Sequence, residues 1–190
     1  PDNGTSVSMG QIPELFFSSS SSSGGAAAAA SSRVSRFGGV ESLRWSLAQI
    51  DAIGVETSAA VSLQGVGLYG GQGEYRVTVR IREGPHSETS SEIYSHTGSF
   101  TSSDNTPARF AFPSSVRLEA GRRYTIVADY RATESGRKAW CGQSGQAEVT
   151  EGGVKFKFIR CNGPDNGTSV SMGQIPELFF SSSSSSGGAA

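Results

Sequence analysis

The stretch EYRVTVRIR, residues 74–82, alternates apolar and polar side chains with a period of two. In an extended chain, successive side chains point to opposite faces, so Tyr75, Val77, Val79 and Ile81 share one face and three arginines lie on the other. This pattern predicts a β-strand with one buried and one solvated face, which is typical of antiparallel sheets.

The same alternation recurs in RYTIVADY at residues 123–130 and in GVKFKFIR at residues 153–160. The segment ESLRWSLAQI, residues 41–50, also fits helical spacing, but its neighbours all resemble strands, so we expect strand or irregular structure there. Many short strands separated by Gly, Pro and Ser turns predict an all-β fold, either an antiparallel β-sandwich or a jelly roll.

Three glycines, Gly65, Gly67 and Gly70, match the G-x-G-x-x-G spacing of dinucleotide-binding loops. Such a loop must open a helix, because the helix N-terminus holds the pyrophosphate. Here GGQGEYRVTVRI follows, which is typical of a turn and another strand. We therefore interpret the glycines as a closely packed strand that leads into a hairpin turn at residues 70–73, and not as a cofactor site.

The length of the chain, 190 residues, fits one domain of ordinary size. The formal net charge is −1, and the arginines alternate with apolar residues instead of forming a block. We therefore expect a solvated sheet face and no nucleic acid partner. Because no apolar run reaches about 18 residues, we also expect no membrane span.

The two cysteines, Cys141 and Cys161, fit either a disulfide or a pair of buried thiols, and the sequence leaves both readings open. Asn3 and Asn166 each begin an Asn-Gly-Thr sequence. This triplet is a glycosylation acceptor in a secreted protein, which makes covalent glycans a candidate partner, but it also fits an Asn-Gly turn.

A catalytic constellation is missing from the sequence. His86 and His96 fall in a Ser-rich stretch that we expect to be a loop, and neither a nucleophile elbow nor metal-ligand spacing accompanies them. We therefore predict that the protein is not an enzyme and has no catalytic, cofactor-binding or metal-binding residue.

The most unusual feature of the chain is an exact duplication, because residues 1–27 recur letter for letter as residues 164–190. The period of 163 residues has the size of a whole domain. Each copy joins a strand-like piece, QIPELFF, to a Ser/Gly/Ala tether. A single domain has one place for its own terminal strand, so the second copy needs a place elsewhere.

An ordered series of segments resembles the PHR domain, a module of Pam/Highwire-type giant ubiquitin ligases and of BTB-domain proteins. The series is RFGGVESLRW, DAIGVE, VSLQGVGLYGGQGEYRVTVRI, RYTIVADYRA and NGTSVSMGQIPELFF, and it runs from about Arg36 to Phe180. The resemblance implies an antiparallel β-sandwich in which QIPELFF is the closing strand. It also implies a recognition module and not a catalyst.

The order of segments in that family implies how the chain divides. Because the NGTS–GQIP segment comes last, residues 36–180 form the PHR-like β-sandwich. Residues 1–17 are then the closing strand of a preceding identical unit, residues 18–35 are a Ser/Gly/Ala linker, and residues 181–190 start the next linker.

Our leading functional expectation from the sequence is a structural repeat unit of a fibre or of an extended, extracellular or cell-surface tandem-repeat protein. Its partners would be identical neighbouring units, joined through an inter-unit strand that consists of Gln11, Ile12, Pro13, Glu14, Leu15, Phe16 and Phe17. The alternative is a cytoplasmic protein-recognition module of a ubiquitin ligase or of a substrate adaptor.

Overall fold

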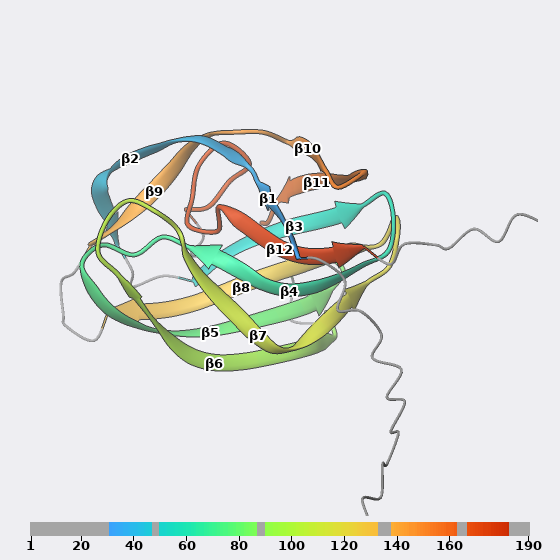
Figure 1. Cartoon of the computed structure of the whole chain (residues 1–190), viewed down its shortest axis with the longest axis horizontal. Helices are drawn as coiled ribbons and strands as arrows, with labels where there is room; N and C mark the ends of the chain where they lie inside the picture. The colour runs from blue at the N-terminus through green and yellow to red at the C-terminus, as the bar shows by residue number, and fades with distance from the viewer. Residues whose placement is uncertain (1–30, 47–49, 87–89, 133–137, 163–166, 183–190) are drawn as a thin grey trace, which may run out of the picture.

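The computed structural model describes residues 31–46, 50–86, 90–132, 138–162 and 167–182 (Figure 1). All the regular secondary structure in this part of the chain is β-strand, as the alternating patterns predict. In the order of the chain they are β1 (Ser32–Ser35), β2 (Phe37–Ser46), β3 (Ile50–Thr57), β4 (Val61–Leu68), β5 (Gly73–Glu83), β6 (Glu92–Ser102), β7 (Ala108–Leu118), β8 (Arg123–Ala132), β9 (Lys138–Gly145), β10 (Glu148–Glu151), β11 (Val154–Arg160) and β12 (Glu177–Ser182).

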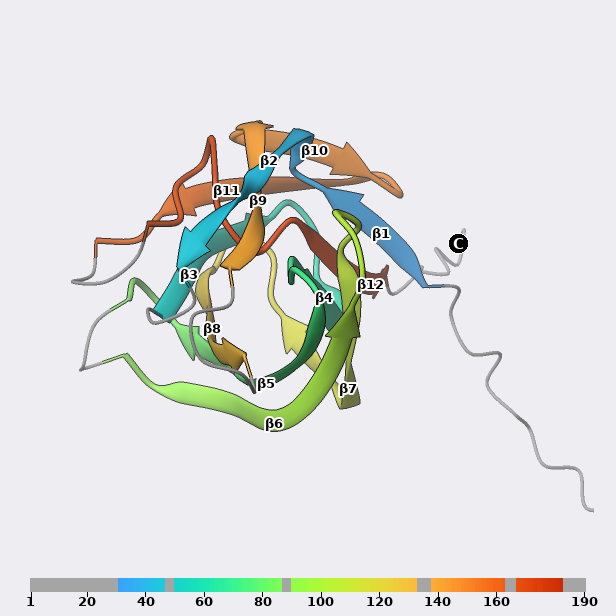
Figure 2. The same cartoon turned by 90° about the vertical axis from the view of Figure 1, so that its left-hand side faces the viewer.

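The strands form three antiparallel sheets. A six-stranded sheet has the order β10-β11-β3-β8-β5-β6, and a four-stranded sheet has the order β1-β12-β4-β7. These two sheets curve around a common interior, as Figure 2 shows. The third sheet, the pair β2-β9, lies in front of them in that view, across one end of the sandwich. The expected antiparallel β-sandwich is therefore confirmed.

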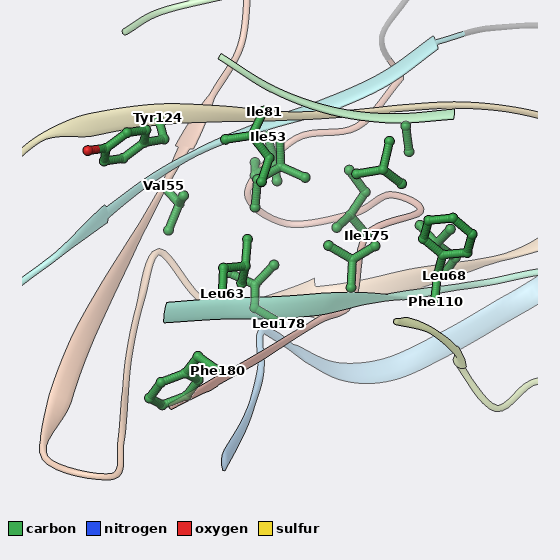
Figure 3. Close-up of a cluster of buried hydrophobic side chains, with 14 of the residues drawn as sticks. Ile53, Val55, Leu63, Leu68, Ile81, Phe110, Tyr124, Ile175, Leu178 and Phe180 are labelled. Carbon is green, nitrogen blue, oxygen red and sulfur yellow. The ribbon is translucent and has the colours of Figure 1, made fainter. Parts of the chain in front are cut away.

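The interior holds the apolar faces of the predicted strands. Tyr75, Val77, Val79 and Ile81 on β5 are all fully buried. The inward side chains of β3, β5 and β8 lie opposite those of β4 and β12. Figure 3 shows Ile53, Val55, Ile81 and Tyr124 facing Leu63, Leu178 and Phe180. Phe180 is fully buried and packs edge-on against Phe156 at 4.7 Å between ring centroids.

The ambiguous segment 41–50 is extended wherever the structure describes it. Residues 41–46 complete β2, and β3 begins at Ile50. Strand structure is therefore confirmed at residues 41–46 and at Ile50, and these described residues contain no helix.

One sequence prediction about loops is wrong, and another is only partly right. No hairpin joins β4 to β5, because β4 lies in the four-stranded sheet and β5 in the six-stranded one, so residues 69–72 cross between sheets. The Ser-rich stretch is a loop only in its first part, where His86 follows β5, because residues 92–102, including His96, form β6 and pair with β5. Turn residues and serines describe local chain geometry, but they do not say which strands pair.

The glycines of β4 allow close packing, as predicted. A Cβ atom at Gly65 would lie 2.6 Å from the carbonyl oxygen of Phe110, and one at Gly67 would lie 2.8 Å from Cβ of Glu177. Both separations are shorter than van der Waals contact. The strands on either side of β4 therefore approach it at a distance that only glycine permits.

The closing strand β12 lies between β1 and β4, and both neighbours are antiparallel to it. Ser32 is opposite Phe180, and Ser35 is opposite Glu177. Residues 32–35 of the stretch 18–35, which we expected to be linker, form β1. Val34 is buried in the core and anchors this short strand.

Several predicted residues lie outside the part of the chain that the structure describes: the inter-unit strand at residues 11–17, Asn3 and Asn166. None of the described segments forms a helix long and apolar enough to cross a membrane.

Candidate functional site

The first polar cluster of interest surrounds Arg36, which sits between β1 and β2 and is fully buried. Its Nε donates a hydrogen bond to the carbonyl of Ile175 at 2.7 Å. Its Nη1 donates to the carbonyls of Ser169 and Val170 at 2.7 and 3.1 Å. The guanidinium also lies 3.9 Å from the ring centroid of Phe37. Arg36 therefore ties the start of the domain to the segment that precedes β12.

The charge of Arg36 is retained in this buried position. Burial lowers its pKa to about 9, and the nearby Asp51 carboxylate opposes that shift. Asp51, itself buried on β3, accepts a hydrogen bond of 2.5 Å from Oγ1 of Thr168. Because a pKa near 9 lies above neutral pH, the guanidinium stays protonated and balances the carboxylate.

The rest of the closing segment is held by β9. Nε2 of Gln174 donates to the carbonyl of Trp140 at 2.6 Å, and Gly142 and Gly173 exchange backbone hydrogen bonds of 2.9 and 3.0 Å. The described part of this motif, residues 167–176, therefore serves mainly inside the domain. Its buried contacts join the β2-β9 sheet to the sandwich, and they do not form an open binding surface.

A second polar cluster lies on the outer face of the six-stranded sheet, where solvent reaches it. Arg76, Thr78, Arg80 and Arg82 project outward from β5, opposite to its apolar face. A shallow hollow opens between β5 and β8 and is lined by Arg76, Val77, Thr78 and Asp129. The predicted solvated arginine face is therefore confirmed, and it contains a depression beside Arg76 and Thr78.

The hollow is built by strand register. Thr78 is paired with Asp129 on β8 and with Thr97 on β6, and the two threonine hydroxyls lie 2.8 Å apart. Sequence analysis did not find Asp129 as a site residue, because it is isolated in sequence. Only the pairing of β5 with β8 brings its carboxylate beside Thr78.

The arginines of this face differ in their partners. Arg80 and Arg82 both approach Oε2 of Glu92, at 3.7 and 3.9 Å. Arg76 forms no ion pair within the described residues, and the residue paired with it on β8 is another arginine, Arg131. The hollow therefore places a cation, a hydroxyl and a carboxylate side by side, and the Arg76 guanidinium is suited to hydrogen bonding with an acidic ligand.

The two histidines are on different elements. His96 lies on β6, with its ring 5.3 Å from that of Phe110, whereas His86 follows β5. Within the part of the chain that the structure describes, no three His, Cys, Asp or Glu residues are grouped so as to hold a metal ion.

Both cysteines are buried thiols, and no disulfide joins them. Cys141 lies on β9 of the two-stranded sheet, whereas Cys161 follows β11 and packs with Ala52 and Val127 against the six-stranded sheet. Burial raises the pKa of the Cys161 thiol. Of the two readings that the sequence left open, the structure has the pair of thiols.

Comparison with known proteins gives one family match, in which the model described as "PHR domain" covers residues 35–181. The E3 ubiquitin-protein ligase MYCBP2 of Danio rerio is 32% identical over 152 residues, which are 76% of this chain and 3% of that protein. The E3 ubiquitin-protein ligase highwire of Drosophila melanogaster is 29% identical over 156 residues, which are 78% of this chain and 3% of that protein.

A second group of relatives carries a different description. BTB/POZ domain-containing protein 6-A of Danio rerio is 34% identical over 134 residues, which are 68% of this chain and 23% of that protein. The chain therefore corresponds to a small part of each relative, about a quarter of the BTB/POZ protein and far less of the two ligases.

Proposed function

The chain belongs to the PHR domain family, and from this premise we propose that it is a protein-recognition module of a ubiquitin ligase or of a substrate adaptor. The proposal is supported by the two kinds of relative, E3 ubiquitin-protein ligases and a BTB/POZ domain-containing protein. A segment similar to this chain occurs inside proteins of two different descriptions, as a transferable binding module would.

The observation that carries the proposal is the open polar face of the six-stranded sheet, with its hollow between Arg76, Thr78 and Asp129. We infer that a partner protein places an acidic side chain beside Arg76. A carboxylate in that position accepts charge-assisted hydrogen bonds from the guanidinium, and these are stronger than neutral ones.

The structural-repeat hypothesis and its extracellular setting find no support in these relatives, which are described as ubiquitin ligases and BTB/POZ proteins. We therefore favour the cytoplasmic alternative. The two buried thiols fit it as well, because disulfides are rare in the reducing cytosol and thiols persist there.

Selection of binders from a displayed library of acidic peptides, followed by calorimetry, tests the proposal. Arg76→Glu should weaken a selected peptide at least about tenfold, the factor that corresponds to 1.4 kcal/mol. Arg117→Glu is the matched control, because Arg117 is an exposed arginine on β7 of the opposite sheet. Unchanged affinity in Arg76→Glu would contradict this placement of the partner, and a library without binders would contradict acidic-peptide recognition.

A further inference from the structure

Residues 167–182 fill one place in the fold, which extends from Asp51 on β3 to the space between β1 and β4, where β12 lies. The Thr168 hydroxyl donates a hydrogen bond to Asp51, and the Ile175 carbonyl accepts one from Arg36. The ring of Phe180 packs against that of Phe156. We call this place, which residues 167–182 occupy, the closing slot. Its walls come from parts of the chain that occur only once in the sequence.

The sequence holds a second set of residues with the same contacts to offer. Because residues 1–27 are identical to residues 164–190, every side chain that enters the closing slot has a counterpart 163 positions earlier. The counterparts of the contact residues are Thr5 for Thr168, Gly10 for Gly173, Gln11 for Gln174, Ile12 for Ile175, Glu14 for Glu177, Leu15 for Leu178 and Phe17 for Phe180.

The first copy is also connected in a way that lets it reach the slot. Ser32 is opposite Phe180 in the β1-β12 pair, so in the same register Phe17 would lie opposite Ser32. Residues 18–31 would then connect two neighbouring antiparallel strands, which lie about 5 Å apart. This Ser/Gly/Ala stretch spans on the order of 45 Å when extended, so its length does not prevent the hairpin.

We propose that the two copies compete for the one closing slot of the same molecule. In one arrangement residues 167–182 fill it, as the structure shows. In the other, residues 4–19 fill it, and the chain becomes a circular permutant of the same domain, a change that folds tolerate when their termini are close together. Residues 167–182 then leave the slot, and they include the largely apolar sequence ELFF.

Placing a charge at the fully buried phenylalanine position tests this competition in the complete chain. The variants are Phe17→Asp, Phe180→Asp and the double variant, because a carboxylate is excluded from the core. Each single variant should keep a cooperative urea unfolding transition, since the intact copy fills the slot, and the double variant should lose it. The proposal fails if Phe180→Asp alone behaves like the double variant, or if the double variant stays folded.

Engineered disulfides show which copy is in place. Val34 is opposite Leu178, and in the same register it would be opposite Leu15. In the Phe180→Asp chain, Val34→Cys should cross-link with Leu15→Cys and not with Leu178→Cys, because directly opposed strand residues have the separation that a disulfide requires. In the unaltered background, Val34→Cys with Leu178→Cys is the positive control.

Gel filtration of the Phe180→Asp chain at submicromolar concentration separates rescue within one molecule from strand exchange between molecules. A folded monomer is the expected species. A folded species that occurs only as a dimer would overturn the proposal, because the first copy would then act on another chain.

Discussion

Thr168 donates a hydrogen bond of 2.5 Å to the buried carboxylate of Asp51, across 117 residues of chain. This contact joins the closing segment to β3, a central strand of the six-stranded sheet. The same carboxylate favours the protonated form of the buried Arg36, whose own donors hold the carbonyls of Ser169, Val170 and Ile175. The closing segment is therefore fixed by buried polar contacts as well as by apolar packing.

The Asp51→Ala variant tests the weight of this polar cluster. Removal of the carboxylate takes away the acceptor of the Thr168 hydroxyl and the charge that favours the protonated form of Arg36. We expect the free energy of unfolding to fall by about 1.5–3 kcal/mol, the range for hydrogen bonds to charged groups. Urea denaturation measures it. Glu151→Ala, at an exposed position on β10, should change the midpoint little, and equal midpoints in both variants would refute a stabilising role for Asp51.

The Gly65→Ala variant tests the close approach of β7 to β4. The added methyl group would lie 2.6 Å from the Phe110 carbonyl oxygen, a backbone atom that cannot move alone. We expect a loss of about 1–3 kcal/mol, as for other overpacked interiors. Gly39→Ala is the control, because its methyl group would meet no atom closer than 3.5 Å. Thermal denaturation of both should show a clear loss for Gly65→Ala alone, and equal melting temperatures would contradict the tight packing.

The reactivity of Cys141 and Cys161 tests their state as buried thiols. Burial shields both sulfurs from reagents, and the raised pKa of Cys161 keeps its thiol protonated, so neither should react quickly with a disulfide reagent in the folded protein. In denaturant, both should react. Intact mass without a reducing agent provides a second measurement, since a molecule two hydrogens lighter than the reduced chain would show a disulfide.

The buried Glu177 makes stability depend on pH. Desolvation raises its pKa above the ordinary glutamate value, although Arg33 at 3.2 Å opposes the shift. The folded state therefore binds the proton of Glu177 more tightly than the unfolded state does. In the pH window from the ordinary glutamate pKa to this raised pKa, the group lowers the free energy of unfolding as pH rises.

Replacement of the carboxyl by an amide removes this dependence. The variant carries Glu177→Gln together with Glu14→Gln, because the two copies are identical. The free energy of unfolding of the unaltered protein minus that of the variant should fall as pH rises through the window and then level off. Denaturation curves between pH 4 and 8 measure it, and a difference that rises with pH would show that the ion pair with Arg33 outweighs burial.

Strands with strict alternation were predictable from sequence, because a one-sided environment imposes a period of two on side chains, as at residues 74–82. β6 was not predictable in this way. Its inward positions include His96 and Gly98, so the sequence of this edge strand does not alternate clearly between apolar and polar residues. The pairing of β4 with β7 and β12 could not be predicted from the sequence either, since turn glycines do not specify a partner strand.

The candidate site depends still more on tertiary structure. The outward arginines of β5 followed from the alternation, but the hollow needs Asp129 from β8 in register with Thr78. The burial of Arg36 was also beyond prediction, because a charged residue is normally exposed and its three carbonyl partners lie more than 130 residues away.

The adjacency of β1 and β12 means that the folded unit receives and releases the chain at one place, with Ser32 beside Phe180. Such a unit can be spliced into a surface loop of a host protein without forcing the host's flanking segments apart. Much larger proteins can therefore accommodate this domain as an insert, with their own architecture left undisturbed on either side of it.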